Sequence, residues 1–519
     1  MAGQHQKPHA IMIPYPYQGH VNPFVYLAVK LASVAGFTVT FVNTHYVHAQ
    51  ISKSLQANNH NKYDDLVAVA RKSGLDIRCV TVGDGFPLGF DRSFNHDQFK
   101  EGILHVFPAH VDELVGELVR SGGDPPVTCL IADTFFTWTS EIAGKYGLVN
   151  VSFWTEPALV LSLYYHLDLL KKNGHFPSND KRYDIIDYIP GVKAIKPKDL
   201  MSYLQSCDTS TVMHRIIYKA FEDVKKADII ICNTVQELEP HTLSALNAYQ
   251  PIYGIGPIFP SGFNKSPITT SLLSESDCSH WLNGKPDGSV LYVSFGSYAH
   301  TSKTDIVEIA HGLMLSGMNF LWVLRPDIVS SEEPNFLPSD FEQNVENRGL
   351  VVPWCRQTEV ISHPAIRGFL SHCGWNSILE SIWCGIPLIC YPLVTDQFTN
   401  RKLVVDEWKI GIDLCDAPPP IGRLGIAAKI DVFMREKSAE LKRSVLQLKD
   451  ALENALASEG SSSTNFNLFV EDVKARSQKL VGLSANGLRK SHAQNHVVPN
   501  LISSLPQGIV PEFYTPNLL

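Results

Sequence analysis

The chain shows the order strand, loop, helix, strand twice, once at its start and once past its middle. The first copy begins with an apolar run at 9–14 and ends in the β-branched run TVTFVNT at 38–44. The second leads from SVLYVSFGS at 289–297 through an apolar helical pattern to NFLWVLR at 319–325. This order builds parallel sheets. A chain of 519 residues is longer than one domain with a single hydrophobic core usually is, so an α/β protein with two domains is predicted.

The stretch between the two copies has the composition of a linker. Residues 254–276 are rich in glycine, proline and serine. The end of the chain shows scattered Gly, Pro, Asn and Ser without a sustained period, which predicts irregular structure. The predicted division is 1–255 for the N-terminal domain, 256–285 for the linker, 286–460 for the C-terminal domain, 461–474 for a last helix and 475–519 for an irregular tail.

Composition narrows the class of protein. The formal net charge is −8 and the sequence shows no basic cluster of the kind that binds nucleic acid, so a nucleic-acid partner is not expected. The apolar runs are shorter than the roughly 18–20 residues of a membrane span, so no stable membrane insertion is expected. The ten cysteines form no C-x-x-C pair and several lie in apolar runs, which is typical of buried thiols in a reducing compartment. No secretory h-region is visible, so we expect a cytoplasmic protein. We also expect a monomer.

The segment FLSHCGWNSILE at 369–380 crowds polar side chains between an apolar run and a helical pattern. Its middle is expected at a helix N-terminus, at the carboxyl end of a parallel strand, where ligands bind in open sheets. Free backbone N–H groups and the helix dipole favour an anion such as phosphate there. Gly374 allows a close approach of the backbone, and His372, Asn376 and Ser377 add hydrogen-bond donors.

A purely structural interpretation of the same segment is also open. Ser377 and Glu380 fit the S-x-x-E capping box, which needs no ligand. Capping does not account for His372, Trp375 and Asn376. The phosphate interpretation is therefore favoured over capping alone.

Residues 354–397 resemble the signature segment of the plant family 1 UDP-glycosyltransferases, which glycosylate small molecules. The matching features are W-x-x-Q at the start, HCGWNS-x-x-E in the middle and D-Q at the end. YPYQGHVNP, SVLYVSFGS and EGSSSTNFNLFVEDV also match, so the resemblance covers about residues 9–474. It implies the GT-B fold, in which two Rossmann-like domains with parallel sheets face each other across a cleft and the last helix returns to the N-terminal domain.

The resemblance assigns the nucleotide contacts to one end of this segment. Trp354 is expected to stack on uracil and the backbone of Cys355 to pair with the uracil edge. Gln357 is expected near the ribose, and Glu380 to bind the ribose hydroxyls. A core position for Trp354 is the alternative. The segment departs from the family at Arg356, where proline is usual.

The same resemblance assigns the rest of the donor. It adds Ser297 to the diphosphate contacts and implies that Trp375, Asp396 and Gln397 contact the sugar. Gln397 is similar to the residue of glucose-using members, which favours UDP-glucose as the donor. A helix N-cap is the alternative role for Asp396.

Two residues of the N-terminal half are candidates for catalysis. His20 lies in the loop YPYQGHVNP after the first strand, and the resemblance makes it the base that takes the acceptor proton. Asp133 ends the apolar run LIAD and matches the aspartate that orients this base. Taken alone, His20 is more often an incidental loop histidine than a base. For Asp133 a helix cap and a catalytic role are equally open from the residues alone.

The acceptor is expected to enter from the N-terminal domain. Trp154 and Thr155 follow a strand and precede an apolar, aromatic helical pattern. In the family this region touches the sugar through the threonine and lines the acceptor pocket. Leu161, Tyr164 and Leu167 equally fit a core.

The resulting prediction is transfer of glucose from UDP-glucose, with inversion, to a hydroxyl of a hydrophobic flavonoid, other phenol or terpenoid. The chain contains no D-x-D pattern, so no metal and no cofactor besides the donor are expected. It also lacks G-x-G-x-x-G and G-x-S-x-G, which argues against a nicotinamide dehydrogenase and a serine hydrolase. A non-catalytic UDP-sugar-binding protein is the alternative.

Overall fold

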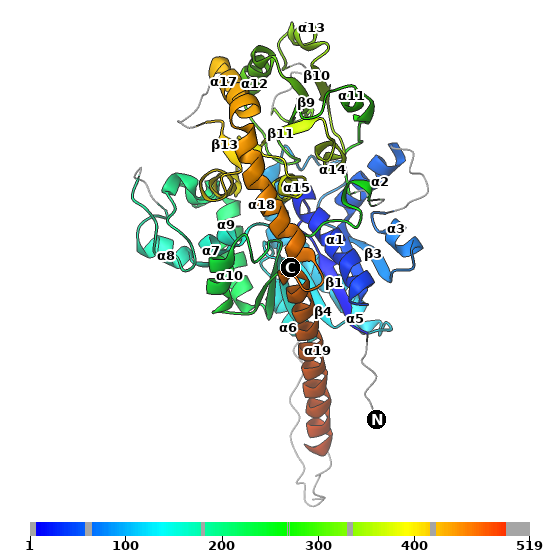
Figure 1. Cartoon of the computed structure of the whole chain (residues 1–519). Coiled ribbons are helices and arrows are strands. Elements are labelled where there is room, and N and C mark those ends of the chain that lie inside the picture. The colour runs from blue at the N-terminus through cyan, green and yellow to red at the C-terminus, as the bar shows by residue number, and fades with distance from the viewer. Residues whose placement is uncertain are drawn as a thin grey trace, which may run out of the picture.

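The computed structural model describes residues 7–57, 65–177, 182–266, 268, 270–329, 336–415 and 422–494, and within them two parallel sheets form two domains (Figure 1). The first sheet has the strand order β3-β2-β1-β4-β5-β6-β7 and the second β10-β9-β8-β11-β12-β13. The first sheet contains β1 (His9–Ile13), β2 (Thr38–Thr44), β3 (Ile77–Val82), β4 (Cys129–Asp133), β5 (Val149–Trp154), β6 (Ile229–Cys232) and β7 (Ile252–Gly254). The second contains β8 (Val290–Ser294), β9 (Asn319–Val323), β10 (Gly349–Val352), β11 (Ile366–Ser371), β12 (Leu388–Cys390) and β13 (Gly411–Asp413).

Helices cover both faces of each sheet, as parallel sheets require. Those of the N-terminal domain are α1 (Gln18–Val34), α2 (His45–Ala57), α3 (Ala68–Lys72), α4 (His96–His105), α5 (Phe107–Arg120), α6 (Thr139–Tyr146), α7 (Ala158–Tyr165), α8 (Leu167–Lys172), α9 (Val212–Asp223) and α10 (Pro240–Asn247). The C-terminal half adds α11 (Ser279–Asn283), α12 (Lys303–Ser316), α13 (Phe341–Val345), α14 (Gln357–Ile361), α15 (Trp375–Trp383), α16 (Gln397–Lys402), α17 (Arg423–Asp431), α18 (Ser438–Leu456) and α19 (Ser461–Gln494).

Strand β1 shows why the residues that follow His9 are apolar. Ala10 and Met12 are fully buried against the side chains of α1 and α2. Ile11 and Ile13 point to the opposite face and pack with α5. Successive side chains of a strand alternate between faces, so a strand covered on both sides has no position for an exposed polar group.

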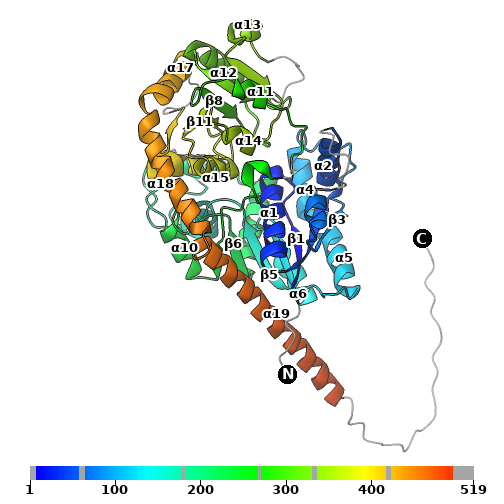
Figure 2. The same ribbon diagram turned by 45° about the vertical axis from the view of Figure 1, so that its right-hand side comes forward.

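The C-terminal helix ties the two domains together (Figure 2). Helix α18 packs against α15 in the C-terminal domain, and the next helix, α19, lies along the first sheet. Phe466 and Phe469 are buried in the core beside α1, and the Asn465 amide donates to the carbonyl of Gly254 at 3.0 Å. The last helix therefore returns to the N-terminal domain.

The prediction of an irregular tail from residue 475 is wrong for 475–494, because α19 continues to Gln494. The segment contains no proline, and Ala, Arg, Gln, Lys and Leu are good helix formers. Gly482 and Gly487 each cost about 1 kcal/mol relative to alanine, which does not end a helix already propagating from Ser461. Residues 495–519 lie outside the described part of the chain.

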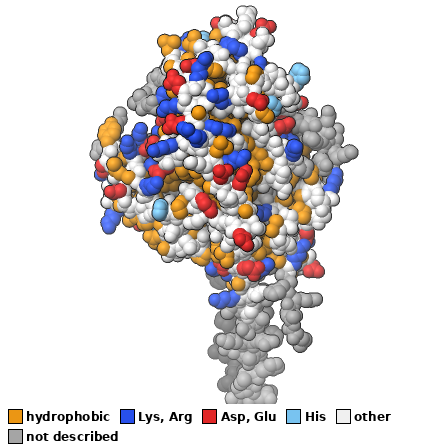
Figure 3. Space-filling view, viewed as in Figure 1, with side chains coloured by type: hydrophobic (Ala, Val, Ile, Leu, Met, Phe, Trp, Pro, Cys, Tyr) orange, Lys and Arg blue, Asp and Glu red, His pale blue; other side chains and the backbone are white. Residues whose placement is uncertain are grey.

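The surface shows no single-sign field on the face seen in Figure 3, where basic and acidic side chains are interspersed among apolar ones. None of the described helices is both long enough and apolar enough to cross a membrane.

Candidate active site

A cleft opens where the carboxyl ends of the two sheets meet. In each sheet the strand order reverses at the first strand of the domain, between β1 and β4 and between β8 and β11. The cleft is lined by residues that follow β1 and β5 in one domain and β8 and β11 in the other. Loops at such a reversal diverge to opposite faces and leave a crevice for a ligand. The topology thus brings together residues that lie hundreds of positions apart in the sequence.

His20 and Asp133 form a hydrogen-bonded pair at this crevice. Imidazole Nδ1 lies 2.8 Å from carboxylate Oδ2. His20 is in the first turn of α1, and Asp133 is the last residue of β4, which pairs with β1. Because a carboxylate only accepts, it holds the proton on Nδ1 and leaves the Nε2 lone pair free.

Asp133 is itself fixed and is not a helix cap. Its second oxygen accepts the backbone N–H of Phe135 at 3.0 Å, and its side chain is 1% exposed. The following helix, α6, begins only at Thr139. The capping alternative for Asp133 is therefore wrong. The carboxylate accepts hydrogen bonds from His20 and from the backbone N–H of Phe135.

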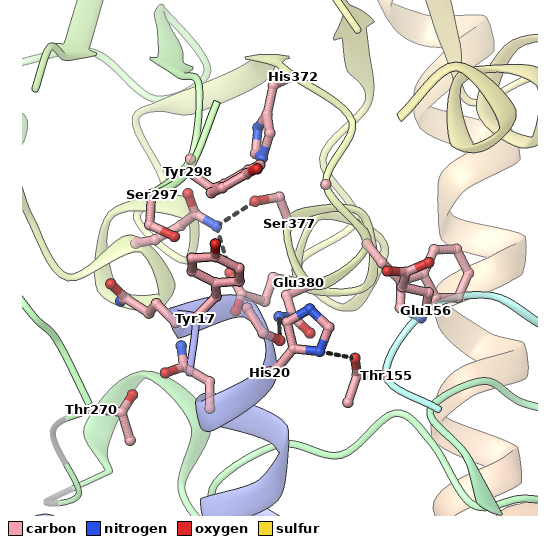
Figure 4. Close-up of a pocket in the computed structure, with 18 of the residues that line it drawn as sticks. Tyr17, His20, Thr155, Glu156, Thr270, Ser297, Tyr298, His372, Ser377 and Glu380 are labelled. Carbon is pink, nitrogen blue, oxygen red and sulfur yellow. Dashed lines mark hydrogen bonds between the residues drawn. The ribbon is translucent and has the colours of Figure 1, made fainter. Parts of the chain in front are cut away.

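Thr155 also reaches the histidine. Its hydroxyl lies 3.1 Å from Nδ1 of His20, as the dashed line in Figure 4 shows. Trp154, by contrast, is 1% exposed and absent from the cleft lining, with its indole N–H donated to the carbonyl of Pro157 at 2.9 Å. The expectation that Trp154 contacts substrate is thus corrected to a core role. Tyr164 lines the cleft, whereas Leu161 lies in the core.

The start of α15 has the geometry of an anion site. Gly374 is its N-cap residue, and no side chain caps the helix. Gly374, Trp375, Asn376 and Ser377 all line the cleft. Ser377 stands inside the helix, so the S-x-x-E capping box does not form. The first turn consequently presents uncapped N–H groups to the cleft.

His372 is wedged between two glycines. A Cβ atom on Gly296 would lie 2.3 Å from imidazole Nε2, and one on Gly374 would lie 2.4 Å from the same atom. Burial, together with the nearby charge of Arg325, lowers the pKa of His372 to about 4. The imidazole is therefore neutral at physiological pH and acts on a phosphate as a hydrogen-bond donor, without a positive charge.

Arg325 is a site residue that the sequence did not reveal. Its guanidinium donates to the carbonyl of Gly296 and, at 2.8 Å, to that of Ala299. These bonds fix the loop that contains Ser297, which lines the cleft. Because an arginine at the end of an apolar strand is common, only the fold identifies this role.

The expected ribose contacts form one network. Gln357 Nε2 donates to Glu380 at 2.7 Å and to Ser377 Oγ at 2.9 Å, and the Tyr292 hydroxyl donates to Gln357 Oε1 at 3.2 Å. Burial raises the pKa of Glu380 to about 7, and the bond from Gln357 opposes this shift. The network leaves a buried carboxyl facing the cleft, where a diol can bind.

The residues expected near uracil also line the cleft. Trp354 is partly buried, and its carbonyl accepts the N–H of Ser276 at 2.9 Å. Cys355 is 4% exposed, and its backbone forms an isolated β-bridge with that of Ser276. At the position where the family has proline, Arg356 pairs with Glu275 at 3.3 Å. Backbone pairing of Ser276 with residues 354–355 thus stiffens this turn.

The residues expected at the sugar are held by specific bonds. Asp396 accepts from the Thr395 hydroxyl at 2.7 Å and from the Asn400 amide at 2.5 Å, and burial raises its pKa. Asp396 stands at the N-cap position of α16 without capping it through its side chain. Gln397 Oε1 accepts the N–H groups of Leu393 and Val394 at 2.9 and 3.0 Å. Both side chains reach the cleft.

Two residues expected to contact the UDP-sugar form hydrogen bonds between the two domains. The Trp375 indole N–H donates to the carbonyl of Asn233 at 2.7 Å, and the Asn376 amide donates to the carbonyl of Gly19 at 2.7 Å. The Trp375 side chain therefore has no free donor for a sugar.

The cleft has further polar groups that the sequence did not single out. Glu156 follows Thr155 and lines the cleft. Tyr15 and Tyr17 also line it, and their buried hydroxyls have no hydrogen-bond partner among the described residues. The buried Lys100 also lines the cleft, and its Nζ lies 3.8 Å from the exposed Asp97 carboxylate. The position of Glu156 directly after Thr155 was the one available signal.

Comparison with known proteins agrees with this geometry. The model of the family described as "UDP-glucoronosyl and UDP-glucosyl transferase" matches residues 259–414. "UDP-glycosyltransferase 86A1" of Arabidopsis thaliana is 61% identical over 492 residues, which cover 94% of this chain and 98% of that protein. The "7-deoxyloganetin glucosyltransferase" of Gardenia jasminoides is 35% identical over 88% of this chain and 96% of its own length.

Solved structures give the same result for the fold. Medicago truncatula UGT71G1 complexed with UDP-glucose superposes with a TM-score of 0.76 at 25% identity, over 91% of this chain and 100% of that chain. Phytolacca americana UGT2 with UDP-2fluoro-glucose and pterostilbene gives 0.72 at 26% identity, over 90% and 99%. The predicted GT-B fold is thereby confirmed. The chain belongs to the plant family 1 UDP-glycosyltransferases.

Proposed function

We propose that this enzyme transfers glucose from UDP-glucose to a hydroxyl of a hydrophobic small molecule, such as a flavonoid, another phenol or a terpenoid, with His20 as the general base. The observation that carries the proposal is the hydrogen bond of 2.8 Å between His20 and Asp133. His20 lines the same cleft as the N-terminus of α15, which no side chain caps. A binding module needs an anion site, but it does not need an oriented imidazole beside that site.

The proposed reaction is a single displacement. Nε2 of His20 takes the proton of the acceptor hydroxyl as its oxygen attacks the anomeric carbon of the sugar. The bond between that carbon and the β-phosphate oxygen breaks, and UDP leaves with the electron pair. N–H groups of α15 and the neutral His372 stabilise the charge on the leaving diphosphate. One displacement inverts the anomeric centre and gives a β-glucoside from an α-linked donor, with no metal required.

Two sets of observations support the choice of substrates. The Medicago neighbour holds UDP-glucose, and the Gardenia relative is a glucosyltransferase by name. The walls of the cleft also carry aromatic side chains, namely Tyr15, Tyr17, Phe135, Tyr164, Tyr203 and Tyr298. An aromatic or polycyclic acceptor matches such a wall. The cytoplasmic location and the monomeric state stay predictions from the sequence.

The test is a transfer assay with the full-length protein. UDP-glucose is offered with a panel of phenols and terpenoid alcohols, and UDP release and glycoside formation are measured. We expect glycoside with wild type and none above background with His20→Ala. His280→Ala, an exposed histidine on α11, is the matched control and is expected to keep full activity. Tight UDP-glucose binding without transfer to any acceptor would favour the non-catalytic alternative.

The anomeric configuration of the product is a separate readout. The proton coupling at the anomeric carbon distinguishes a β- from an α-glucoside by nuclear magnetic resonance. An α-glucoside would contradict the single displacement.

A further inference from the structure

A short segment of the N-terminal domain meets the loop that carries the residues expected at the sugar. The segment contains two single-turn 3₁₀ helices, η1 (Pro197–Asp199) and η2 (Ser202–Leu204). Its Ser202 contacts Thr395 of the C-terminal domain, which directly precedes Asp396 and Gln397. These three residues line the cleft, whereas Ser202 is not part of that lining. Ser202 can therefore act on a bound sugar only through its neighbours.

Ser202 pairs with both main-chain groups of Thr395. The backbone N–H of Thr395 donates to the hydroxyl oxygen of Ser202 at 2.9 Å. In return, the backbone N–H of Ser202 donates to the carbonyl of Thr395, also at 2.9 Å. Because hydrogen bonds are directional, two of them running in opposite directions fix both the position and the orientation of the Thr395 backbone.

Thr395 has a backbone conformation that needs such support. Its φ is +60°, in the left-handed region, where a residue with a β-branched side chain is a genuine outlier. Residues persist in this region only where the surrounding structure holds them, and they are concentrated at sites that bind ligands. Thr395 lies in the turn between β12 and α16, so its conformation sets the direction in which the next two side chains leave the backbone.

The side chain of Asp396 depends on the same turn. The Thr395 hydroxyl donates to Asp396 Oδ1 at 2.7 Å, and the Asn400 amide donates to Oδ2 at 2.5 Å. The Asn400 amide also donates to the carbonyl of Cys373 at 2.9 Å, immediately before the N-cap of α15. A continuous series of contacts thus leads from Ser202 through Thr395 and Asp396 to the helix expected at the diphosphate.

The two domains are also joined here by contacts that do not involve Ser202. The Thr399 hydroxyl donates to the carbonyl of Asp199 at 2.7 Å, and Arg401 forms a buried ion pair with the Asp199 carboxylate. Both contacts come from α16. Since these contacts dock η1 on α16, the Ser202 hydroxyl is not needed to hold the domains together. Its bond contributes the fixed conformation of Thr395.

We propose that Ser202 is a positioning residue for the donor sugar, because it holds Thr395 in the left-handed conformation and thereby aligns Asp396 and Gln397 with the hydroxyls of the hexose. The inference rests on the proposed function, in which Asp396 and Gln397 are the residues at the sugar. Ser202 belongs to the N-terminal domain, and Tyr203 beside it lines the cleft. The sugar subsite is therefore complete only while the two domains are in contact.

The test measures binding, so it needs no acceptor and no turnover. Calorimetric titration of the full chain with UDP, UDP-glucose and UDP-galactose gives three dissociation constants. The two hexoses differ only in the configuration of one hydroxyl, so the ratio of their affinities reports on contacts with hydroxyls. For wild type we expect UDP-glucose to bind at least about tenfold more tightly than UDP-galactose. In Ser202→Ala we expect this ratio to fall about three- to tenfold, while the affinity for UDP is unchanged.

Three further variants separate positioning from folding. Ser202→Thr keeps the hydroxyl and is expected to keep the wild-type ratio. Thr399→Val removes a second hydrogen bond between the domains, and its effect must fall equally on all three nucleotides. Ser210→Ala removes an exposed hydroxyl whose bond, to Asp208 at 2.6 Å, stays within its own loop, and it is expected to change none of the three constants.

An unchanged ratio of the UDP-glucose and UDP-galactose affinities in Ser202→Ala would overturn the inference. So would a loss of UDP affinity as large as the loss of UDP-glucose affinity, because Ser202 would then support only the contact between the domains. Equal affinity of the wild type for the two sugars would overturn it as well, since no hydroxyl would then be read. If the ratio shifts as expected while no acceptor is ever glucosylated, the role of Ser202 stands and only the proposed transfer fails.

Discussion

The side-chain amide of Asn376 donates to the main-chain carbonyl of Gly19, at 2.7 Å, across the cleft between the domains. Gly19 directly precedes His20, and Asn376 lies in the first turn of the helix expected to hold the diphosphate. The base and the donor site are therefore joined by one hydrogen bond, although 357 positions separate its ends. Any shift of one domain against the other moves His20 relative to the donor, which makes the mutual position of the domains part of the catalytic geometry.

The bond between Asp133 and His20 predicts a specific defect in Asp133→Asn. An amide does not hold the proton on Nδ1 as a carboxylate does, so the imidazole loses its required tautomer and the stabilisation of its cationic form. We expect kcat to fall about 10²–10⁴-fold. UDP affinity, measured by calorimetry, should stay at the wild-type value, because Asp133 belongs to the other domain. A kcat within threefold of wild type would show that Asp133 does not orient the base.

The packing of His372 against Gly374 predicts non-additive effects. In Gly374→Ala the new methyl group would lie 2.4 Å from Nε2, so the imidazole must move away from the phosphate position. We expect UDP affinity to fall about tenfold or more. Combined with His372→Ala the same alanine meets no ring, and the double variant should bind UDP as well as His372→Ala alone. If the two losses simply add, the clash is not the cause.

The buried carboxyl of Glu380 predicts a pH dependence of stability. Its folded pKa of about 7 is raised from the ordinary 4.5, so the folded protein binds a proton that the unfolded chain has released. The free energy of unfolding should therefore fall as pH rises from about 4.5 to 7, by up to about 3 kcal/mol relative to Glu380→Gln. Urea unfolding of both proteins at pH 5 and pH 7.5 measures this difference. Parallel profiles would place the Glu380 carboxyl in a more hydrated environment.

The last helix predicts a sharp contrast between two alterations. Phe469 is fully buried between α19 and the first sheet, so Phe469→Ala should lower the free energy of unfolding by about 3–5 kcal/mol. A chain that ends at Leu480 keeps the described side-chain contacts of α19 with the sheet, and its melting temperature should stay within about 2 °C of the full chain. A large loss in the shortened chain would give the end of α19 a structural role.

The sequence predicted the fold and much of the site because both follow from local rules. Apolar runs alternating with helical patterns imply parallel sheets, and polar residues at strand ends imply a crevice. His20, Asp133 and Ser377 could be placed near strand ends in this way, whereas the catalytic roles of His20 and Asp133 followed only from the resemblance to the family. Trp154 could not, because every residue of β5 is buried and alternation does not say which side faces the cleft.

Other features depend on contacts that no local pattern contains. The fixation of the Ser297 loop by Arg325 joins segments that meet only in the folded domain. Glu156 lines the cleft, whereas Glu239, 83 positions later, accepts the first N–H groups of α7. The length of α19 was misjudged because glycine and asparagine residues weaken a helix without ending it.

The most direct test of the account is the rate ratio of wild type to His20→Ala over a series of substituted phenols of falling pKa. A phenol with a pKa near 10 needs a base, so the ratio should be about 10²–10⁴. It should shrink towards one as the phenol pKa approaches 7, because the acceptor then arrives ionised. A ratio that stays constant over the whole series would contradict the account, since it would mean that His20 shapes the site without taking the proton.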